Sequence, residues 1–105
     1  MVASGDVRGT IKLWDAAGGQ ELFTLKDHNN DVSGLVFTRD GKHLISGGWD
    51  GKLRVWDVAS GELLRTVIAY TKEQDQSING LALSSDGKTL ATASDDGTIG
   101  LWGLR

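Results

Sequence analysis

The sequence predicts an all-β fold made of repeated units of four short antiparallel strands. A phrase with tryptophan as its second-last residue occurs three times, as "VASGDVRGTIKLWD", "SGGWDGKLRVWD" and "LATASDDGTIGLWG". Trp14 and Trp56 are 42 residues apart and Trp56 and Trp102 are 46 apart, which indicates a period near 42 with about four residues inserted in the second interval. No window keeps a helical apolar stripe over about ten residues, and the 15 glycines provide turns in a chain without proline.

The first unit begins partway through its repeat. The residues up to Trp14 have strand composition, and "AAGGQELFTL" after it combines a glycine turn with an alternating apolar segment. Two or three strands are therefore expected before the middle unit.

The middle unit contains the complete pattern. Residues 39–42 (Arg-Asp-Gly-Lys) form a hairpin turn between two alternating segments, and "VASGELLRTV" follows Trp56 with another glycine turn. Four strands are expected, at Val32–Thr38, His43–Gly48, Leu53–Val58 and Glu62–Ile68.

The third unit repeats the hairpin in "INGLALSSDGKTLATAS" and reaches its third strand at Trp102. Three strands are expected there, without an outer one. The inserted segment "AYTKEQDQS" before this unit is expected to be a solvated loop.

Composition limits the classes of partner. The chain has 39% hydrophobic and 24% charged residues, as ordinary globular proteins do. A net charge of -3 argues against a nucleic acid or an anionic membrane as the partner. The lack of cysteine excludes disulfides and thiolate catalysis. With neither a secretory leader nor an apolar run of roughly 18 residues, the simplest expectation is an intracellular, cytoplasmic protein without a cofactor.

The period, the strand count and the tryptophan-aspartate ending together resemble the WD-repeat family. The resemblance extends over essentially the whole chain. It implies β-propeller blades of four antiparallel strands, with an incomplete ring in one chain. The expected division is a partial first blade at residues 1–27, a complete second blade at 28–69 and a third blade that lacks its outer strand at 70–105.

The family has a structural tetrad in each blade: a histidine before the first strand, a serine or threonine in the second, an aspartate in the next turn and the tryptophan of the third. The resemblance assigns these roles in the middle unit to His28, Ser46, Asp50 and Trp56. We expect Asp50 to accept a hydrogen bond from His28, which links through the Ser46 hydroxyl to the Trp56 indole. All four polar groups then have partners.

The flanking units match the tetrad only in part. The histidine position of the third unit falls in the inserted loop, where Tyr70 or Gln74 aligns, and Arg8 stands at the aspartate position of the first unit. The matching residues are Ser4 and Trp14 in the first unit and Thr92, Asp96 and Trp102 in the third.

His28, Ser46 and Asp50 also have the composition of a hydrolase triad. Ser46 lies in a predicted strand without a G-x-S-x-G elbow, and the tetrad accounts for the same residues, so we expect no enzyme. No metal site is expected either, because no ligand spacing is met by His28 with the carboxylates of Asp27, Asp31, Asp95 and Asp96. The other histidine, His43, is expected on the surface.

The resemblance places two types of loop on one face of the propeller. The expected partner-binding face contains Asp31, Ser33 and Trp49 from the middle unit and Ser77, Asn79 and Asp95 from the third. An aromatic side chain at the turn position of Trp49 is costly in water unless it packs or binds. Binding by Trp49 and packing of Trp49 on a neighbouring loop both stay open at this point.

The leading functional hypothesis is a non-catalytic protein-protein interaction scaffold segment whose loop face holds a protein or peptide. The alternative is an excised or engineered propeller fragment that self-associates and has no recognition role. Closed propellers usually have at least about four blades, so blade faces and a strand edge of this chain are expected to meet other propeller blades, from the same or another chain. We favour a segment of a longer propeller, because the ends of the chain do not fall at blade boundaries, and we expect the isolated chain to associate.

Overall fold

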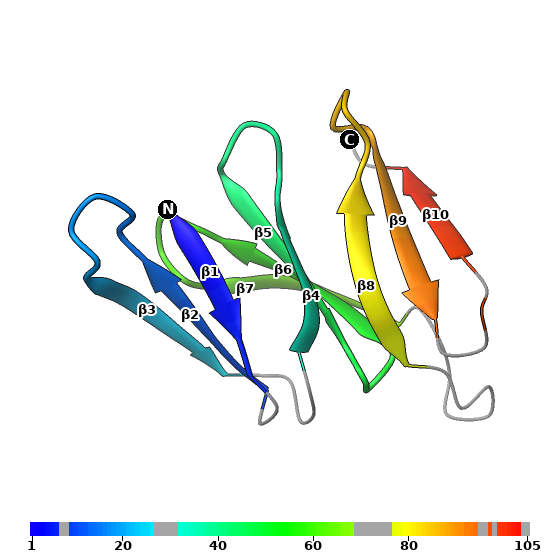
Figure 1. Cartoon of the computed structure of the whole chain (residues 1–105), viewed down its shortest axis with the longest axis horizontal. Coiled ribbons are helices and arrows are strands. Elements are labelled where there is room, and N and C mark those ends of the chain that lie inside the picture. The colour runs from blue at the N-terminus through cyan, green and yellow to red at the C-terminus, as the bar shows by residue number, and fades with distance from the viewer. Residues whose placement is uncertain (7–8, 27–31, 69–76, 95–96, 98, 104–105) are drawn as a thin grey trace.

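The structure is a computed structural model, and it describes residues 1–6, 9–26, 32–68, 77–94, 97 and 99–103. Regular structure in this part of the chain is entirely β-strand (Figure 1). The same residues contain no helix that is long and apolar enough to cross a membrane. The strands are β1 (Val2–Gly5), β2 (Thr10–Trp14), β3 (Glu21–Lys26), β4 (Val32–Phe37), β5 (His43–Gly48), β6 (Lys52–Asp57), β7 (Leu63–Ile68), β8 (Ile78–Leu83), β9 (Thr89–Ser94) and β10 (Ile99–Gly103).

The strands form three antiparallel sheets, which we name the first (β1-β2-β3), the second (β4-β5-β6-β7) and the third (β10-β9-β8). The predicted all-β fold with a four-stranded middle unit is confirmed. The strands of the second sheet begin and end within one residue of the predicted positions. Among the described residues, the first and third units each contribute three strands.

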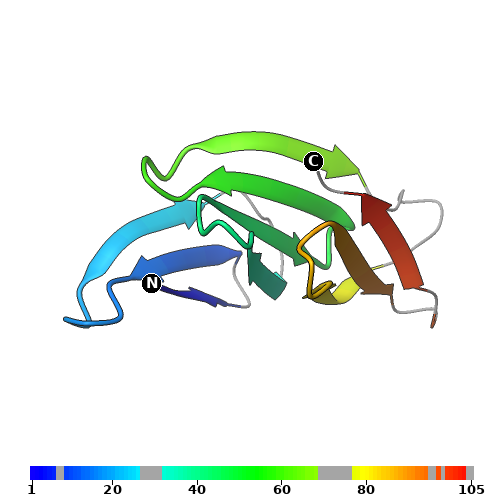
Figure 2. The same ribbon diagram turned by 90° about the horizontal axis from the view of Figure 1, so that it is seen from above.

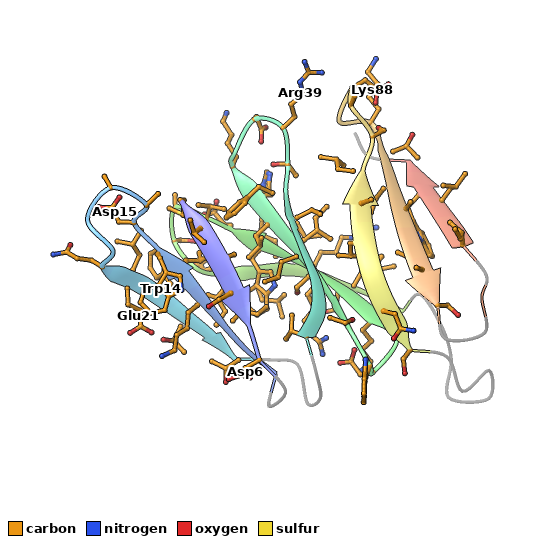
Figure 3. The ribbon with its side chains drawn as sticks, in the orientation of Figure 1. Asp6, Trp14, Asp15, Glu21, Arg39 and Lys88 are labelled. Atoms are coloured by element: carbon orange, nitrogen blue, oxygen red, sulfur yellow. The ribbon has the colours of Figure 1, made fainter. Side chains whose placement is uncertain are left out.

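Two hairpin turns with the sequence Asp-Gly-Lys close β4-β5 and β8-β9. In the first of them, Asp40 Oδ1 accepts hydrogen bonds from the Thr38 hydroxyl at 2.7 Å and from the Lys42 amide at 2.9 Å. The same two bonds recur in the hairpin of the third sheet. Arg39 and Lys88 lie at the tips of these neighbouring hairpins (Figure 3). A local aspartate therefore holds each turn.

Each sheet has two chemically different faces, because successive side chains of a strand point to opposite sides. We name the side that carries the repeated tryptophan the tryptophan face and the opposite side the aliphatic face. In the second sheet Leu44 and Trp56 are paired neighbours on the tryptophan face, whereas Ile45 and Val55 are paired neighbours on the aliphatic face.

The three sheets are stacked face to face in an open arc (Figure 2). The aliphatic face of the first sheet packs on the tryptophan face of the second, where the buried cluster consists of Ile11, Leu13, Leu25, Leu44, Trp56 and Val58. The aliphatic face of the second sheet packs on the tryptophan face of the third, where the buried cluster consists of Ile45, Leu53, Ile78 and Leu90. Both contacts thus join the same two kinds of face.

Glycines allow the sheets to approach at their inner strands. A Cβ atom on Gly34 of β4 would lie 2.7 Å from Leu81 Cγ of β8, and one on Gly47 would lie 3.0 Å from Ile78 Cγ2. The hydroxyl of Ser33 donates across the same contact to the carbonyl of Ile78. The second and third sheets are therefore joined by backbone proximity as well as by apolar packing.

Candidate functional site

Each sheet contains a hydrogen bond between its repeated tryptophan and a hydroxyl on the adjacent strand. Antiparallel pairing places the hydroxyl two residues along from the residue opposite the tryptophan, within reach of the indole N–H. The Nε1 atoms of Trp14, Trp56 and Trp102 donate to Ser4 Oγ at 3.1 Å, to Ser46 Oγ at 2.9 Å and to Thr92 Oγ1 at 3.2 Å. The structure thus brings together the tryptophan and the hydroxyl of the predicted tetrad in the middle unit, and those of the partial matches in the two flanking units.

Asp50 occupies the turn between β5 and β6, and its carboxylate has a partner that the sequence analysis did not identify. Arg54 Nη1 lies 2.8 Å from Asp50 Oδ2, and the Lys52 amide donates to Asp50 Oδ1 at 3.1 Å. The Arg54 side chain is only 3% exposed. A charged residue in a strand is usually interpreted as solvent-facing. The sequence did contain one indication of this position. Arg54 stands two residues before Trp56 in the same strand, so its side chain lies on the tryptophan face.

His28 and Asp96, the remaining tetrad members, lie outside the described residues, and so do Asp31 and Asp95 of the expected binding face. Tyr70, Gln74 and Arg8 lie outside them as well. The contacts assigned to these side chains stay predictions.

Ser46, the nucleophile of the alternative hydrolase hypothesis, lies in the middle of β5 and is completely buried. Its oxygen accepts a hydrogen bond from the indole N–H of Trp56. In the antiparallel pairing of β5 with β6, Ser46 lies opposite Arg54. No group of three or more metal-ligating side chains occurs among the residues that the structure describes.

Trp49 lies in the turn after β5, and 51% of its surface is exposed. The turn is closed by the Gly51 amide, which donates to the Gly48 carbonyl at 3.2 Å, and Gly51 has a φ of 74°. The Ser77 hydroxyl, from the start of the third sheet, donates to the carbonyl of Trp49 at 3.3 Å. Two residues of the expected binding face are thereby brought together.

The other described residues of that face differ in their environment. Asn79 is exposed on β8. Ser33 is half-buried, and its hydroxyl is directed to carbonyl groups of Gly47 and Ile78 at the contact between the second and third sheets.

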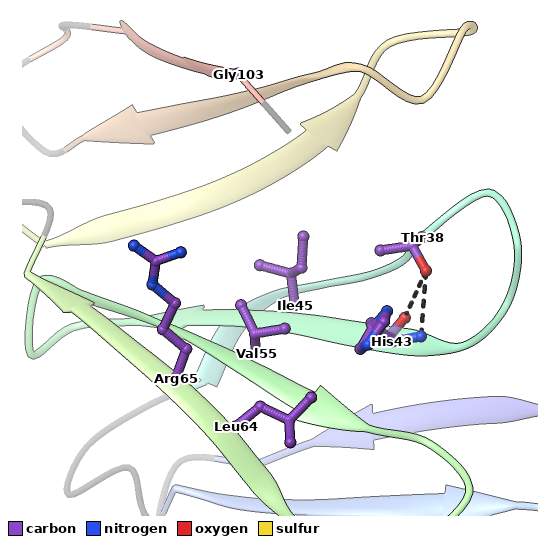
Figure 4. A pocket seen from close by; sticks show the side chains of 7 residues that line it. All are labelled: Thr38, His43, Ile45, Val55, Leu64, Arg65 and Gly103. Carbon is purple, nitrogen blue, oxygen red and sulfur yellow. Dashed lines mark hydrogen bonds between the residues drawn. The ribbon is translucent and has the colours of Figure 1, made fainter. Parts of the chain in front are cut away.

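A cleft of about 650 Å³ opens at the other end of the strands, between the second sheet and the end of β10 (Figure 4). Its walls combine the apolar side chains of Ile45, Val55 and Leu64 with the polar side chains of His43 and Arg65. Sequence analysis did not predict it, because its two walls come from different repeats. His43 itself is half-buried at this cleft, whereas it was expected on the surface.

Comparison with known proteins identifies the repeat. A family model described as "WD domain, G-beta repeat" matches residues 19–57 and 61–103. Each match begins before the outer strand of one sheet and ends with the last residue of the third strand of the next sheet. The sequence repeat is therefore offset by one strand from the sheet.

Several curated proteins are similar to part of the chain. DDB1- and CUL4-associated factor 13 of Dictyostelium discoideum is 49% identical over 55 residues, which cover 52% of this chain and 12% of that protein. Nuclear distribution protein PAC1-1 of Uncinocarpus reesii is 46% identical over 68 residues, which cover 64% and 15%. The mitotic checkpoint protein bub3 of Dictyostelium discoideum is 37% identical over 62 residues, which cover 59% and 18%. The match thus spans less than a fifth of each of these relatives.

Among solved structures, the computationally designed Ika4 protein has a TM-score of 0.79 and 29% sequence identity to this chain. The similarity covers 98% of this chain and 59% of that protein.

Proposed function

Because this chain belongs to the WD-repeat family, we propose that it is a non-catalytic protein-interaction module whose loop face holds a protein or peptide, with Trp49 as the anchor of the contact. Proteins of this family are in general interaction modules rather than enzymes. The chain matches only a small share of its relatives, so the partner is proposed here as a chemical class and not by name.

The observation that carries this proposal is the exposure of Trp49 on a backbone that is held in place. Its own turn and the Ser77 hydroxyl both fix the main chain at Trp49. A large aromatic side chain on a rigid backbone loses little conformational entropy on binding, and such residues are enriched among those that dominate interface energies. Binding therefore explains the exposure of Trp49 better than packing on a neighbouring loop.

The proposed tetrad of His28, Ser46, Asp50 and Trp56 has a structural role in this module. Asp50 directly follows Trp49, and its carboxylate is held by Arg54 in the next strand. The bond from Trp56 to Ser46 ties that strand to β5, from which the turn emerges. We assign these residues to positioning the turn that presents Trp49.

The names of the relatives support an interaction role. DDB1- and CUL4-associated factor 13 is named for its association with two other proteins. The remaining face residues, Asp31, Ser33, Ser77, Asn79 and Asp95, are proposed as contacts around the Trp49 anchor. The net charge of -3 favours a protein or peptide partner over a nucleic acid or an anionic membrane.

The test is a peptide-display selection on the immobilised chain, followed by affinity measurements with the selected peptides on the wild type and on Trp49→Ala. We expect the substitution to weaken binding by about 1 to 4 kcal/mol, as loss of an aromatic anchor does. The thermal melting temperature should change little, because Trp49 contributes no buried side chain to either core.

Leu64→Ala is the matched control. Leu64 is 52% exposed but lies on β7 beside the cleft, at the opposite end of the strands from Trp49. Peptides that bind the wild type and Trp49→Ala equally well would contradict the proposal, and so would a selection that enriches no peptide.

A further inference from the structure

Three cations lie in the neighbouring hairpin turns of the second and third sheets, at the end of the strands opposite Trp49. Arg39 and Lys42 belong to the β4-β5 turn, and Lys88 belongs to the β8-β9 turn. All three residues are exposed. Arg39 and Lys88 extend away from the sheets at the two tips (Figure 3). We name these three residues the hairpin cations.

The carboxylates in the same turns are directed inward and do not pair with these cations. Asp86 Oδ1 accepts hydrogen bonds from the Ser84 hydroxyl at 2.6 Å and from the Lys88 amide at 2.9 Å, and Asp40 makes the same two bonds in the other turn. No ion pair among the residues that the structure describes involves a hairpin cation. The charged donors of the hairpin cations are therefore available to a ligand.

Arg39 contacts the neighbouring hairpin as well as its own. A Cβ atom on Gly87 would lie 3.0 Å from Arg39 Cβ and 3.3 Å from Arg39 Cδ, so the aliphatic part of Arg39 lies against the β8-β9 turn. Ser85 occupies the position of Arg39 in that turn and leaves room there. Packing of the aliphatic part restricts the side chain, while the guanidinium stays at the surface. The cations of the two hairpins thus belong to one surface.

We propose that the hairpin cations bind an acidic peptide segment of a partner protein, with one carboxylate on the guanidinium of Arg39 and another on the ammonium of Lys88. The planar guanidinium presents pairs of N–H donors that match a carboxylate. This surface is an addition to the proposed function and does not depend on it, because Trp49 lies at the other end of the strands.

The turn carboxylates favour an acidic peptide over a polyanion. Hydrogen bonds from a hydroxyl and an amide hold the pKa of Asp40 and of Asp86 below the ordinary value, so both side chains are ionised near neutral pH. The closely spaced charges of a nucleic acid or an anionic membrane would meet these carboxylates together with the cations. A peptide can instead place separate side-chain carboxylates on separate cations. The net charge of -3 also opposes a polyanion.

The test follows the fluorescence anisotropy of a labelled peptide of alternating glutamate and glycine during titration with the chain at low ionic strength. Arg39→Gln/Lys88→Gln should bind this peptide about tenfold more weakly than the wild type, because two exposed charge pairs are lost. Added salt should weaken binding by the wild type, since exposed pairs are screened. The same peptide with glutamine in place of glutamate should not bind.

Lys12→Gln/Lys52→Gln is the matched control. It removes the same amount of positive charge from β2 and β6, outside both hairpin turns, and it should bind the acidic peptide as the wild type does. Trp49→Ala should also bind it as the wild type does. A failure of this proposal is therefore distinguishable from a failure of the proposed function.

A second variant tests the turn carboxylates. Asp40→Asn/Asp86→Asn keeps an acceptor oxygen in each turn but removes two negative charges beside the cations, so it should bind the acidic peptide more tightly than the wild type. Cooperative thermal melts show that each variant is folded at the temperature of the titration. Lys88→Gln alone replaces the double variant of the cations if that variant is not folded.

The proposal is overturned if the wild type does not bind the acidic peptide, or if the folded cation variant binds it as tightly as the wild type. It is also overturned if the matched control loses as much affinity as the cation variant, or if the folded asparagine variant binds no more tightly than the wild type. Tighter binding of a single-stranded oligonucleotide or of phosphatidylserine vesicles than of the peptide would show a polyanion surface and would overturn it as well.

Discussion

The Ser46 hydroxyl and the Arg54 guanidinium are both buried on the tryptophan face of the second sheet, and each is bonded to a neighbour within that sheet. A buried polar group costs free energy unless it has such a partner. The free-energy cost of burying Ser46 and Arg54 is therefore offset by these bonds. The Arg54 guanidinium contacts Asp50, which follows Trp49 in the turn between β5 and β6.

At this scale the proposed tetrad can be tested through its histidine. His28→Ala should destabilise the chain by about 1 to 3 kcal/mol, because Asp50 and Ser46 lose a buried partner. His43→Ala should do little, since the bonds of His43 at the hairpin are made by its backbone amide and carbonyl. Thermal melts of the two variants measure both effects, and equal losses of stability would remove His28 from the tetrad.

At the scale of the element, the β4-β5 and β8-β9 hairpins depend on aspartate side chains in their turns. The Thr38 hydroxyl, together with the Lys42 amide, holds the pKa of Asp40 below its ordinary value of 3.8. The Ser84 hydroxyl and the Lys88 amide lower the pKa of Asp86 in the same way. In both turns the hydrogen bonds favour the ionised carboxylate.

The lowered pKa values predict how these hairpins respond to acid. A carboxyl whose pKa is lower in the folded state stabilises the fold fully above its unfolded pKa, and that contribution is lost as the pH falls through the folded pKa. Asp40→Asn/Asp86→Asn should therefore melt below the wild type near neutral pH. The difference should shrink as the pH falls below 3.8 and close once both carboxyls are protonated. Thermal melts at several pH values measure this, and a difference that is constant with pH would contradict it.

At the scale of the whole molecule, the stack depends on how closely successive sheets approach. The inner strand β4 contacts both β1 and β8, and β8 also contacts β5. Gly34 of β4 and Gly80 of β8 are equivalent in the repeat, but Gly34 has Leu81 of the third sheet against it, whereas no atom lies within 4 Å of the Cβ position of Gly80. The same residue type thus has different roles at the two positions.

This difference makes the two glycines a matched pair. Gly34→Ala should destabilise the chain by about 1 to 3 kcal/mol, because the new Cβ would lie within 3.0 Å of Leu81 and force the second and third sheets apart. Gly80→Ala should change stability by less than about 1 kcal/mol, since nothing lies within 4 Å of its Cβ position. Chemical denaturation of both variants gives the comparison, and equal effects would show that the approach of β4 to β8 does not limit stability.

The sequence by itself determined the strands and their grouping. The tryptophan period located the three units, the Asp-Gly turns located the hairpins, and the alternation of apolar residues located the strands of the second sheet to within one residue. The same alignment also paired Ser46 with Trp56. These features depend on local backbone preferences and on contacts between adjacent strands of one repeat, so a short stretch of sequence is sufficient to specify them.

Only the tertiary structure decided which side chains are buried between sheets. Ile11 and Ile99 occupy the same repeat position, yet one is completely buried and the other is 69% exposed. The burial of Arg54 with Asp50 and the contact of Ser33 with β8 were likewise not readable from the pattern. The physical reason is that the repeat specifies which face a side chain lies on, whereas burial depends on whether another sheet packs against that face.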